Sequence, residues 1–123
     1  MMARIRTGEL DIAYERSGQG PALLLLHGAE ATKQMFAALV PRLAGRFTVI
    51  TYDQRDCGDT EGPDRATTLL DLAEDALSLL LALGLPRVHV FGSSFGGRLA
   101  QVLAGERHVP LVMMTLTNNA VGP

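Results

Sequence analysis

The stretch VHVFGSSFGGRLAQVLAG, residues 88–105, passes from a β-branched segment into a helix-favouring segment through a few small residues. Its first part, Val88–Phe91, is apolar enough to predict a buried strand, and residues 95–104 have a helical pattern. Between them, Gly92-Ser93-Ser94-Phe95-Gly96 fits the pattern G-x-S-x-G with Ser94 at its centre. The sequence therefore predicts a sharp strand-to-helix turn that carries a serine.

The two glycines around this serine have a steric explanation. In so sharp a turn the central residue takes a strained backbone conformation, and the residues two before and two after it approach the turning chain closely. A Cβ atom at Gly92 or Gly96 would clash there. The turn would hold the Ser94 hydroxyl above the sheet, beside the positive end of the following helix, which is a nucleophile's position. The alternative is a Ser/Gly loop that only leads into a helix.

A second stretch, ALLLLHGA at residues 22–29, reads as a buried strand that ends in His-Gly. If this strand lies beside the one that ends at Gly92, then Ala29 and the serine both lie two residues beyond adjacent strand ends, with the strands about 4.8 Å apart. The backbone N–H groups of Ala29 and Phe95 would then converge on one oxyanion. We interpret His27 as a structural part of this loop and not as a base.

Apolar runs without alternation predict strands buried on both faces, and helical patterns between them predict a mostly parallel sheet built from crossovers. Thr68 with Asp71 forms a capping box before the clearest helix, and Gly84 followed by Pro86 ends it. The expected buried strands are Ala22–Leu26, Phe47–Tyr52, Val88–Phe91 and Leu111–Leu116; the expected helices are Gln34–Leu43, Leu69–Leu83 and Phe95–Ala104; Arg4–Thr7 and Leu10–Ser17 are expected as an antiparallel edge.

Composition narrows the class of protein. A chain of 123 residues with 47% hydrophobic and 20% charged residues predicts one globular domain. The net charge of −2 argues against nucleic acid and anionic membrane as partners. Cys57 has no second cysteine to pair with, the N-terminal MMARIRTG lacks the apolar segment of a signal peptide, and the run Leu23–Leu26 is too short to span a bilayer. We therefore expect a cytoplasmic protein.

Three motifs together resemble a known family. The strand with His-Gly at 22–28, YDQRDCGDT at 52–60 and strand-GSSFGG-helix at 88–97 are similar, in order and spacing, to the N-terminal half of α/β-hydrolase-fold serine hydrolases. The resemblance implies an α/β fold with sheet order 1-2-4-3-5-6, helices on both faces and residues 1–123 as the N-terminal core portion of the domain. The family often has Asp-x-Arg-Gly-x-Gly-x-Ser in the second motif, where this chain has Asp56 for the first glycine and Thr60 for the serine.

The resemblance also implies roles for single residues. Ser94 would be the nucleophile that attacks a small acyl substrate, and the N–H groups of Ala29 and Phe95 would form the oxyanion hole. A serine at position 94 argues against the dehalogenase and epoxide-hydrolase branches, which have aspartate there. No cofactor and no metal is expected. The residues expected to support the motif are His27, Gly28, Gly92, Gly96 and Gly97.

A serine nucleophile needs a base and an acid to orient that base, and in this family both follow the serine along the chain. After Ser94 the only candidates are Glu106 and His108, which we expect at the opposite end of the sheet, as we do His89. We therefore expect residues 1–123 to be part of a longer hydrolase or a truncated relative that is nearly inactive alone. Residues 111–116 would then form an unprotected sheet edge through which copies could associate.

Three functions stay open at this point. The leading hypothesis is a serine hydrolase that cleaves an ester, lactone, thioester or amide through an acyl-enzyme on Ser94. The main rival is a degenerate hydrolase fold or fragment without catalysis, and a third is a cofactor-free perhydrolase or acyltransferase that uses the same site. A nucleotide-binding domain is disfavoured because no Gly-rich fingerprint follows Leu26.

Overall fold

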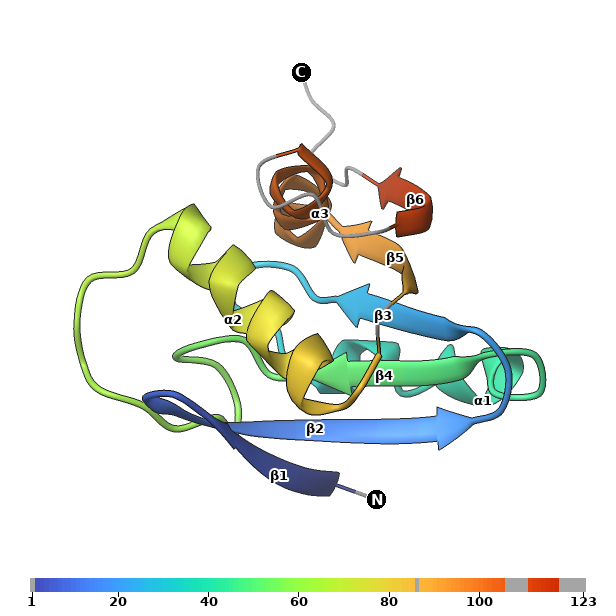
Figure 1. Ribbon diagram of the computed structural model, residues 1–123, viewed down its shortest axis with the longest axis horizontal. Helices are drawn as coiled ribbons and strands as arrows, with labels where there is room; N and C mark the ends of the chain where they lie inside the picture. Colours follow the sequence, from blue (N-terminus) through green and yellow to red (C-terminus); the bar gives the residue numbers. More distant parts are fainter. Residues whose placement is uncertain (1, 86, 106–110, 118–123) are drawn as a thin grey trace.

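The chain, described here from a computed structural model, forms one six-stranded mixed sheet with helices on both faces (Figure 1). The structure describes residues 2–85, 87–105 and 111–117, the last of these by their backbone alone. The sheet order β1-β2-β4-β3-β5-β6 confirms the order that the resemblance implied. The strands are β1 (Met2–Thr7), β2 (Leu10–Gly18), β3 (Ala22–Leu26), β4 (Thr48–Tyr52), β5 (Val88–Ser93) and β6 (Leu111–Thr117).

The N-terminal edge is antiparallel, as predicted. Strands β1 and β2 form a hairpin around Gly8, whose φ of 62° lies in the left-handed region that glycine adopts at little cost. Strand β2 also pairs antiparallel with β4. The remaining pairs, β3 with β4, β3 with β5 and β5 with β6, are parallel. The carboxyl ends of β3, β4 and β5 therefore meet at one edge of the sheet, and the loops that leave them lie together.

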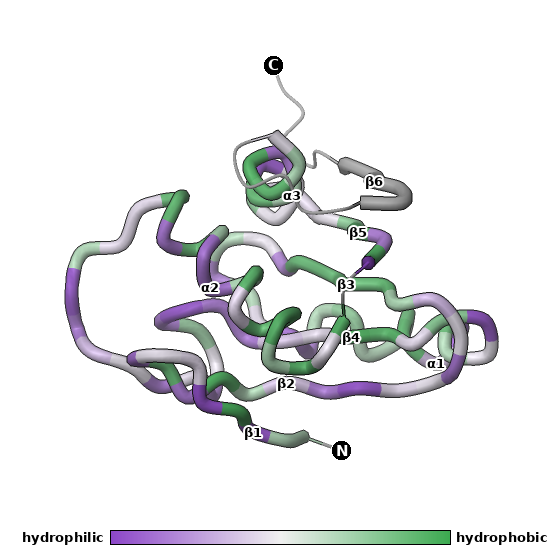
Figure 2. Tube along the Cα trace, viewed as in Figure 1, coloured by the Kyte–Doolittle hydropathy of each residue, from purple (hydrophilic) through white to green (hydrophobic). Residues whose placement is uncertain are grey.

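Each face of the sheet has its own hydrophobic cluster. On one face, alternate residues of the central strands pack against α2 (Leu69–Ala82) and α3 (Phe95–Gly105). On the other face, Leu23, Leu25 and Val49 pack against Phe36 and its neighbours. Strand β3 contributes to both clusters, is buried along its whole length and is hydrophobic throughout in Figure 2. The unalternating leucine run is explained by this position between two covered faces.

The helix α2 begins and ends as its sequence predicts. The Thr68 side chain accepts a hydrogen bond from the Asp71 backbone N–H at 3.1 Å, and the Asp71 carboxylate accepts one from the Thr68 N–H at 2.9 Å. This capping box satisfies two of the N–H groups that a helix start leaves unpaired. Gly84, with a φ of 72°, follows the helix and lets the chain leave it.

The predicted continuous helix over Gln34–Leu43 is wrong. The structure has two four-residue pieces instead, a 3-10 helix η1 (Lys33–Phe36) and α1 (Val40–Leu43). Pro41 accounts for the break, because proline lacks an N–H donor and its ring clashes with the carbonyl four residues earlier in a continuous helix. The same proline is tolerated in the first turn of α1, where no donor is needed.

The expectation of strands buried on both faces is confirmed for β3 and β4. In β5 it is only partly right, because His89 and Phe91 are half-buried on the face that the short η1 and α1 pieces cover. Strand β6 spans Leu111–Thr117, close to the predicted bounds. Glu106 and His108 lie outside the described residues. Within the described part of the chain, no helix has the length and hydrophobicity needed to cross a membrane.

Candidate active site

Ser94 is the single residue that joins strand β5 to helix α3. The strand ends at Ser93 and the helix begins at Phe95, so the chain reverses from one element to the other across Ser94 alone. The φ of Ser94 is 56°, a left-handed conformation that L-residues other than glycine rarely adopt. The Gly97 N–H closes the turn by donating to the Ser94 carbonyl oxygen at 2.9 Å. The serine is half-buried at the amino-terminal end of an 11-residue helix.

The flanking glycines are needed for steric reasons. A Cβ on Gly92 would overlap the carbonyl group of Gly96 and come within 2.6 Å of the Gly97 nitrogen. A Cβ on Gly96 would overlap the carbonyl oxygen of Leu26, at the end of the neighbouring strand β3. One glycine therefore permits the turn itself, and the other permits the helix to begin against the adjacent strand.

The loop after β3 passes close to this turn. Strands β3 and β5 are parallel neighbours, with Leu26 opposite Gly92 in the register, which is the adjacency that the sequence argument required. A Cβ on Gly28 would lie 3.7 Å from the Cβ of Ser94 and 3.4 Å from the carbonyl oxygen of Ser93. Ala29, the next residue, is exposed. The structure thus brings together at one sheet edge all eight residues singled out from the sequence: His27, Gly28, Ala29, Gly92, Ser94, Phe95, Gly96 and Gly97.

His27 is buried, with 1% of its surface exposed, and both of its ring nitrogens have backbone partners. Its Nδ1 lies 2.8 Å from the Gly28 carbonyl oxygen, to which it donates, and its Nε2 accepts from the Gln54 N–H at 3.0 Å. This pair of bonds requires the neutral ring with the proton on Nδ1. Burial lowers the pKa of His27, which favours the same neutral form. The ring therefore fixes the loop and has no nitrogen left to accept a proton from Ser94.

The loop after β4 accommodates both departures from the family motif. Asp56 takes the left-handed conformation, with a φ of 65°, at the position where the family often has glycine. The Thr60 hydroxyl donates to the Asp53 carbonyl oxygen at 2.6 Å and accepts from the Ala13 N–H at 3.0 Å. Thr60 therefore ties this loop to β2 with the kind of oxygen that the family's serine would provide. Sequence reasoning did not single out Lys33, Asp53 or Gln54, which also connect the loops at this edge.

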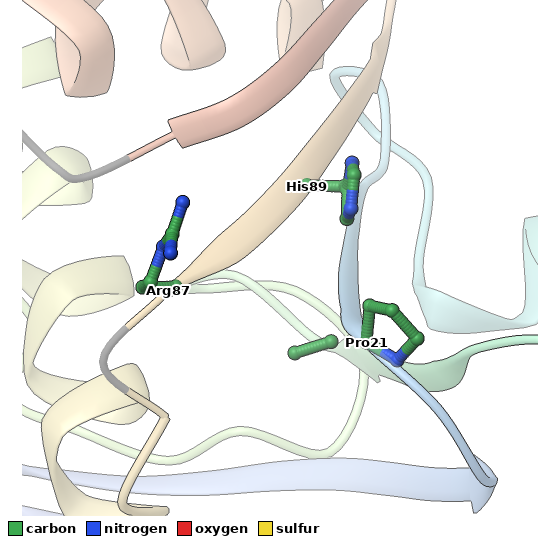
Figure 3. Close-up of a pocket in the computed structure, with 4 residues that line it drawn as sticks. Pro21, Arg87 and His89 are labelled. Atoms are coloured by element: carbon green, nitrogen blue, oxygen red, sulfur yellow. The ribbon is translucent and has the colours of Figure 1, made fainter.

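A cavity of about 340 Å³ lies at the other end of the sheet, lined by Pro21, Ala22, Arg87 and His89 (Figure 3). His89 pairs in register with Leu23 at the start of β3, whereas Ser94 follows the far end of β5. The His89 ring packs edge-on against Phe47 at 5.7 Å, and its buried Nδ1 has no hydrogen-bond partner in the described structure. His89 is thus placed away from Ser94. In the described part of the chain, no three His, Cys, Asp or Glu side chains are grouped to hold a metal ion.

A sheet of this order, with a sharp strand-to-helix turn after β5, is typical of the α/β-hydrolase class of proteins. Residues 21–121 match the family model for the alpha/beta hydrolase fold, and the chain belongs to this family. It is 33% identical to a hydrolase from Pseudomonas aeruginosa PA01 of known crystal structure, with a TM-score of 0.89 over 99% of this chain and 48% of that one.

Two curated relatives of this chain are named as enzymes that catalyse different reactions. A fluoroacetate dehalogenase from Burkholderia sp is 35% identical over 105 residues, which cover 81% of this chain and 34% of the relative. A 2-(acetamidomethylene)succinate hydrolase from Mesorhizobium japonicum is 31% identical over 109 residues, covering 89% of this chain and 39% of the relative. The chain thus spans between about a third and two fifths of the length of these relatives. These relatives are similar to this chain within one fold family, and their names state different substrates.

Proposed function

We propose that this chain carries the nucleophile of a serine hydrolase that cleaves an ester, lactone, thioester or amide. Ser94 would attack the acyl carbonyl and form an acyl-enzyme, which water then hydrolyses. The observation that carries the proposal is the backbone of Ser94: a φ of 56°, alone between β5 and α3, with glycines where a Cβ would overlap neighbouring carbonyl groups. Such stored strain is typical of functional sites, and a surface loop has no need of it.

The oxyanion of the tetrahedral intermediate would be held by the backbone N–H groups of Ala29 and Phe95. Phe95 is the first residue of α3, so its N–H has no partner within the helix, and the positive end of the helix dipole points the same way. Ala29 follows Gly28, which lies against Ser94. Removal of one such donor typically costs about 10²–10³ in rate.

Serine at position 94 favours acyl cleavage through an acyl-enzyme over the dehalogenation that the name of one relative states. The dehalogenase and epoxide-hydrolase branches of the family have aspartate at this position, whereas this chain has Ser94 there. A serine hydroxyl needs a base, and His27 is not suited to that role because both its ring nitrogens bind backbone groups. We therefore propose that base and acid come from sequence beyond residues 1–123. Loss of the base costs about 10⁶ in kcat, so these residues alone should be nearly inactive.

A fluorophosphonate probe tests the proposal, because its phosphoryl oxygen can use the same oxyanion hole and its adduct leaves a mass that can be located. Without the base the oxyanion hole alone still leaves a rate about 10³–10⁴ above that in water, so labelling should be slow but specific. The wild-type chain should be labelled on Ser94 over hours, and Ser94→Ala should not be labelled. Ser93→Ala is the matched control, since it removes the buried neighbouring hydroxyl and leaves the nucleophile. Equal labelling of the wild type and Ser94→Ala, or no labelling of either, would contradict the proposal and favour the non-catalytic fold.

A further inference from the structure

Asp53, the first residue after β4, receives hydrogen bonds from two other parts of the site. Its Oδ1 accepts from the Lys33 backbone N–H at 2.8 Å, and its Oδ2 accepts from the Lys33 Nζ at 3.1 Å. Oδ2 also accepts from the Asp59 N–H at 2.8 Å. Asp53 and Lys33 have 1% and 4% of their surface exposed. One carboxylate thus joins the end of the loop after β3 to the loop after β4.

The charges make this tie difficult to release. Burial raises the pKa of Asp53, but the hydrogen bonds from Asp59 and Lys33 outweigh it, and the net direction is downward, so the carboxylate is ionised. The Lys33 ammonium group has a second carboxylate nearby, Asp59 Oδ2 at 3.6 Å, which is largely exposed. A buried ammonium without its buried partner is strongly unfavourable. Asp53 therefore holds Lys33 at two points, through the backbone N–H and through the side-chain ammonium group.

Gln54 makes the corresponding tie at the other end of the loop. Its backbone N–H donates to His27 Nε2 at 3.0 Å, and its side-chain Nε2 donates to the His27 carbonyl oxygen at 2.8 Å. Gln54 has 4% of its surface exposed. Two adjacent residues, Asp53 and Gln54, thus fix both ends of residues 27–33, which we term the oxyanion loop; Asp53 and Gln54 together are termed the clamp.

The middle of the oxyanion loop has few contacts of its own. Ala29 and Glu30 are exposed, and Glu30 has a left-handed φ of 60°. Within this middle part, the Ala31 N–H donates a hydrogen bond to the Gly28 carbonyl oxygen at 3.2 Å. The Ala29 N–H therefore depends for its position on the two clamped ends.

We propose that Asp53 and Gln54 are positioning residues for the oxyanion hole: they place the Ala29 N–H opposite Ser94 without touching the substrate. The inference rests on the proposed function, because it assigns Ala29 as an oxyanion donor. A displacement of about 1 Å in such a group can cost about 10² in rate. The clamp therefore acts on the transition state through the backbone that it holds.

The test uses Gln54→Met, which removes the side-chain donor and keeps the backbone N–H and a similar volume. The control is Gln34→Met, the same change at an exposed residue of η1 whose amide reaches Glu15 at 3.4 Å. For each variant the fluorophosphonate reaction is resolved into the affinity for the probe and the rate constant of the covalent step, and the melting temperature is recorded. We expect Gln54→Met to slow the covalent step about ten- to hundredfold with affinity and folding kept, and Gln34→Met to leave all three unchanged.

A second measurement does not depend on Ser94 reacting. The amide resonance of Ala29 and its hydrogen-exchange rate are followed by NMR in the same variants. We expect the Ala29 amide to shift and exchange faster in Gln54→Met and to match the wild type in Gln34→Met. An unaltered Ala29 amide in a folded Gln54→Met protein overturns the clamp, as does a wild-type covalent rate. Absence of wild-type labelling with a displaced Ala29 amide instead overturns the proposed function and keeps the positioning role.

Discussion

Ser94 occupies a backbone conformation that costs an L-residue about 1–2 kcal/mol. The glycines on either side of it add no steric clash to this cost. Gly92 and Gly96 have no Cβ where the turning chain and strand β3 come closest. The turn that presents the Ser94 hydroxyl therefore depends on the absence of a Cβ atom at Gly92 and Gly96. This dependence can be measured without any substrate.

Gly96→Ala should destabilise the fold because the added Cβ overlaps the carbonyl oxygen of Leu26, which is backbone and cannot rotate away. We expect a loss of about 1–3 kcal/mol or more in the free energy of urea unfolding. Gly105→Ala is the matched control at the end of the same helix, where a Cβ would meet nothing within 4 Å. It should be neutral or stabilise by about 0.5–1 kcal/mol. Equal effects of the two substitutions would show that the approach to β3 carries no strain.

Prediction from sequence worked at single residues wherever the reason was local. The glycine spacing around Ser94 predicted a strand-to-helix turn. The steric demand on Gly92 is local, because its Cβ would meet Gly96 and Gly97, whereas the demand on Gly96 comes from Leu26 of the neighbouring strand. The clamp was missed because Lys33 and Asp53 are 20 residues apart, and nothing in the sequence around a lysine shows that it is buried. The left-handed conformations of Glu30 and Asp56 were not predicted either.

At the scale of elements, Arg55 connects the loop after β4 to helix α2. Its guanidinium group donates to both carboxylate oxygens of Asp75, from Nε at 3.0 Å and from one terminal nitrogen at 2.9 Å. The other terminal nitrogen donates to Glu9 at 3.1 Å, in the turn between β1 and β2. Both Arg55 and Asp75 are buried, and the hydrogen bonds from Arg55 to Asp75 raise the pKa of the guanidinium group. Three elements thus meet at one cation.

Asp75→Leu should cost about 3–5 kcal/mol, because among the described residues it leaves the buried Arg55 charge with Glu9 as its one remaining ion-pair partner. The double variant Arg55→Met with Asp75→Leu should lose less than Asp75→Leu alone, since no unpaired charge remains. Urea unfolding of both single variants and the double variant gives the coupling free energy. If the double variant lost the sum of the two single losses, the two side chains would not be coupled and the elements would be joined by packing alone.

Helices were predicted correctly from the sequence where the apolar spacing and the capping residues agreed. The 14 residues of α2 carry a capping box at the start and a glycine after the end, and the predicted helix agrees with the observed one to within a residue. The segment 34–43 has helical spacing of apolar residues but also Pro41, and the prediction gave the spacing more weight than the proline. Four residues in each piece are too few for a helix to be stable without tertiary contacts.

At the scale of the whole molecule, His27 makes folding sensitive to mild acid. Burial lowers its pKa below the ordinary value of 6.5, so the unfolded chain binds a proton that the folded chain does not. Stability should be full above about pH 6.5 and fall below it, by up to about 1.4 kcal/mol per pH unit until the folded ring itself is protonated. Asp53, with its lowered pKa, should add a second loss below its ordinary value of 3.8.

Urea unfolding from pH 8 to pH 5 measures the first of these steps. The wild type should lose stability in this range, and a folded His27→Gln variant should show a flatter dependence because it has no ring to protonate. Protonation of Nε2 also breaks its bond from the Gln54 N–H, so the Ala29 amide should shift over the same pH range. A wild-type curve that is flat from pH 6.5 to pH 5 would mean that His27 takes up its proton without cost.

The two edges of the sheet differ in how they resist pairing with another chain. Edge strand β1 has the exposed cations Arg4 and Arg6, whereas edge strand β6 has the sequence LVMMTLT without a charge. Because charged side chains discourage strand addition and uncharged edges invite it, we predict that residues 1–123 associate through β6.

Light scattering over a range of concentrations should show growing particles, and hydrogen exchange should slow with concentration in residues 111–117 but not in β1. A sharp monomer at every concentration, or protection that grows at β1 instead, would show that the uncharged edge is not the contact. The paired comparison matters because association through any other surface would leave the exchange of both edge strands unchanged.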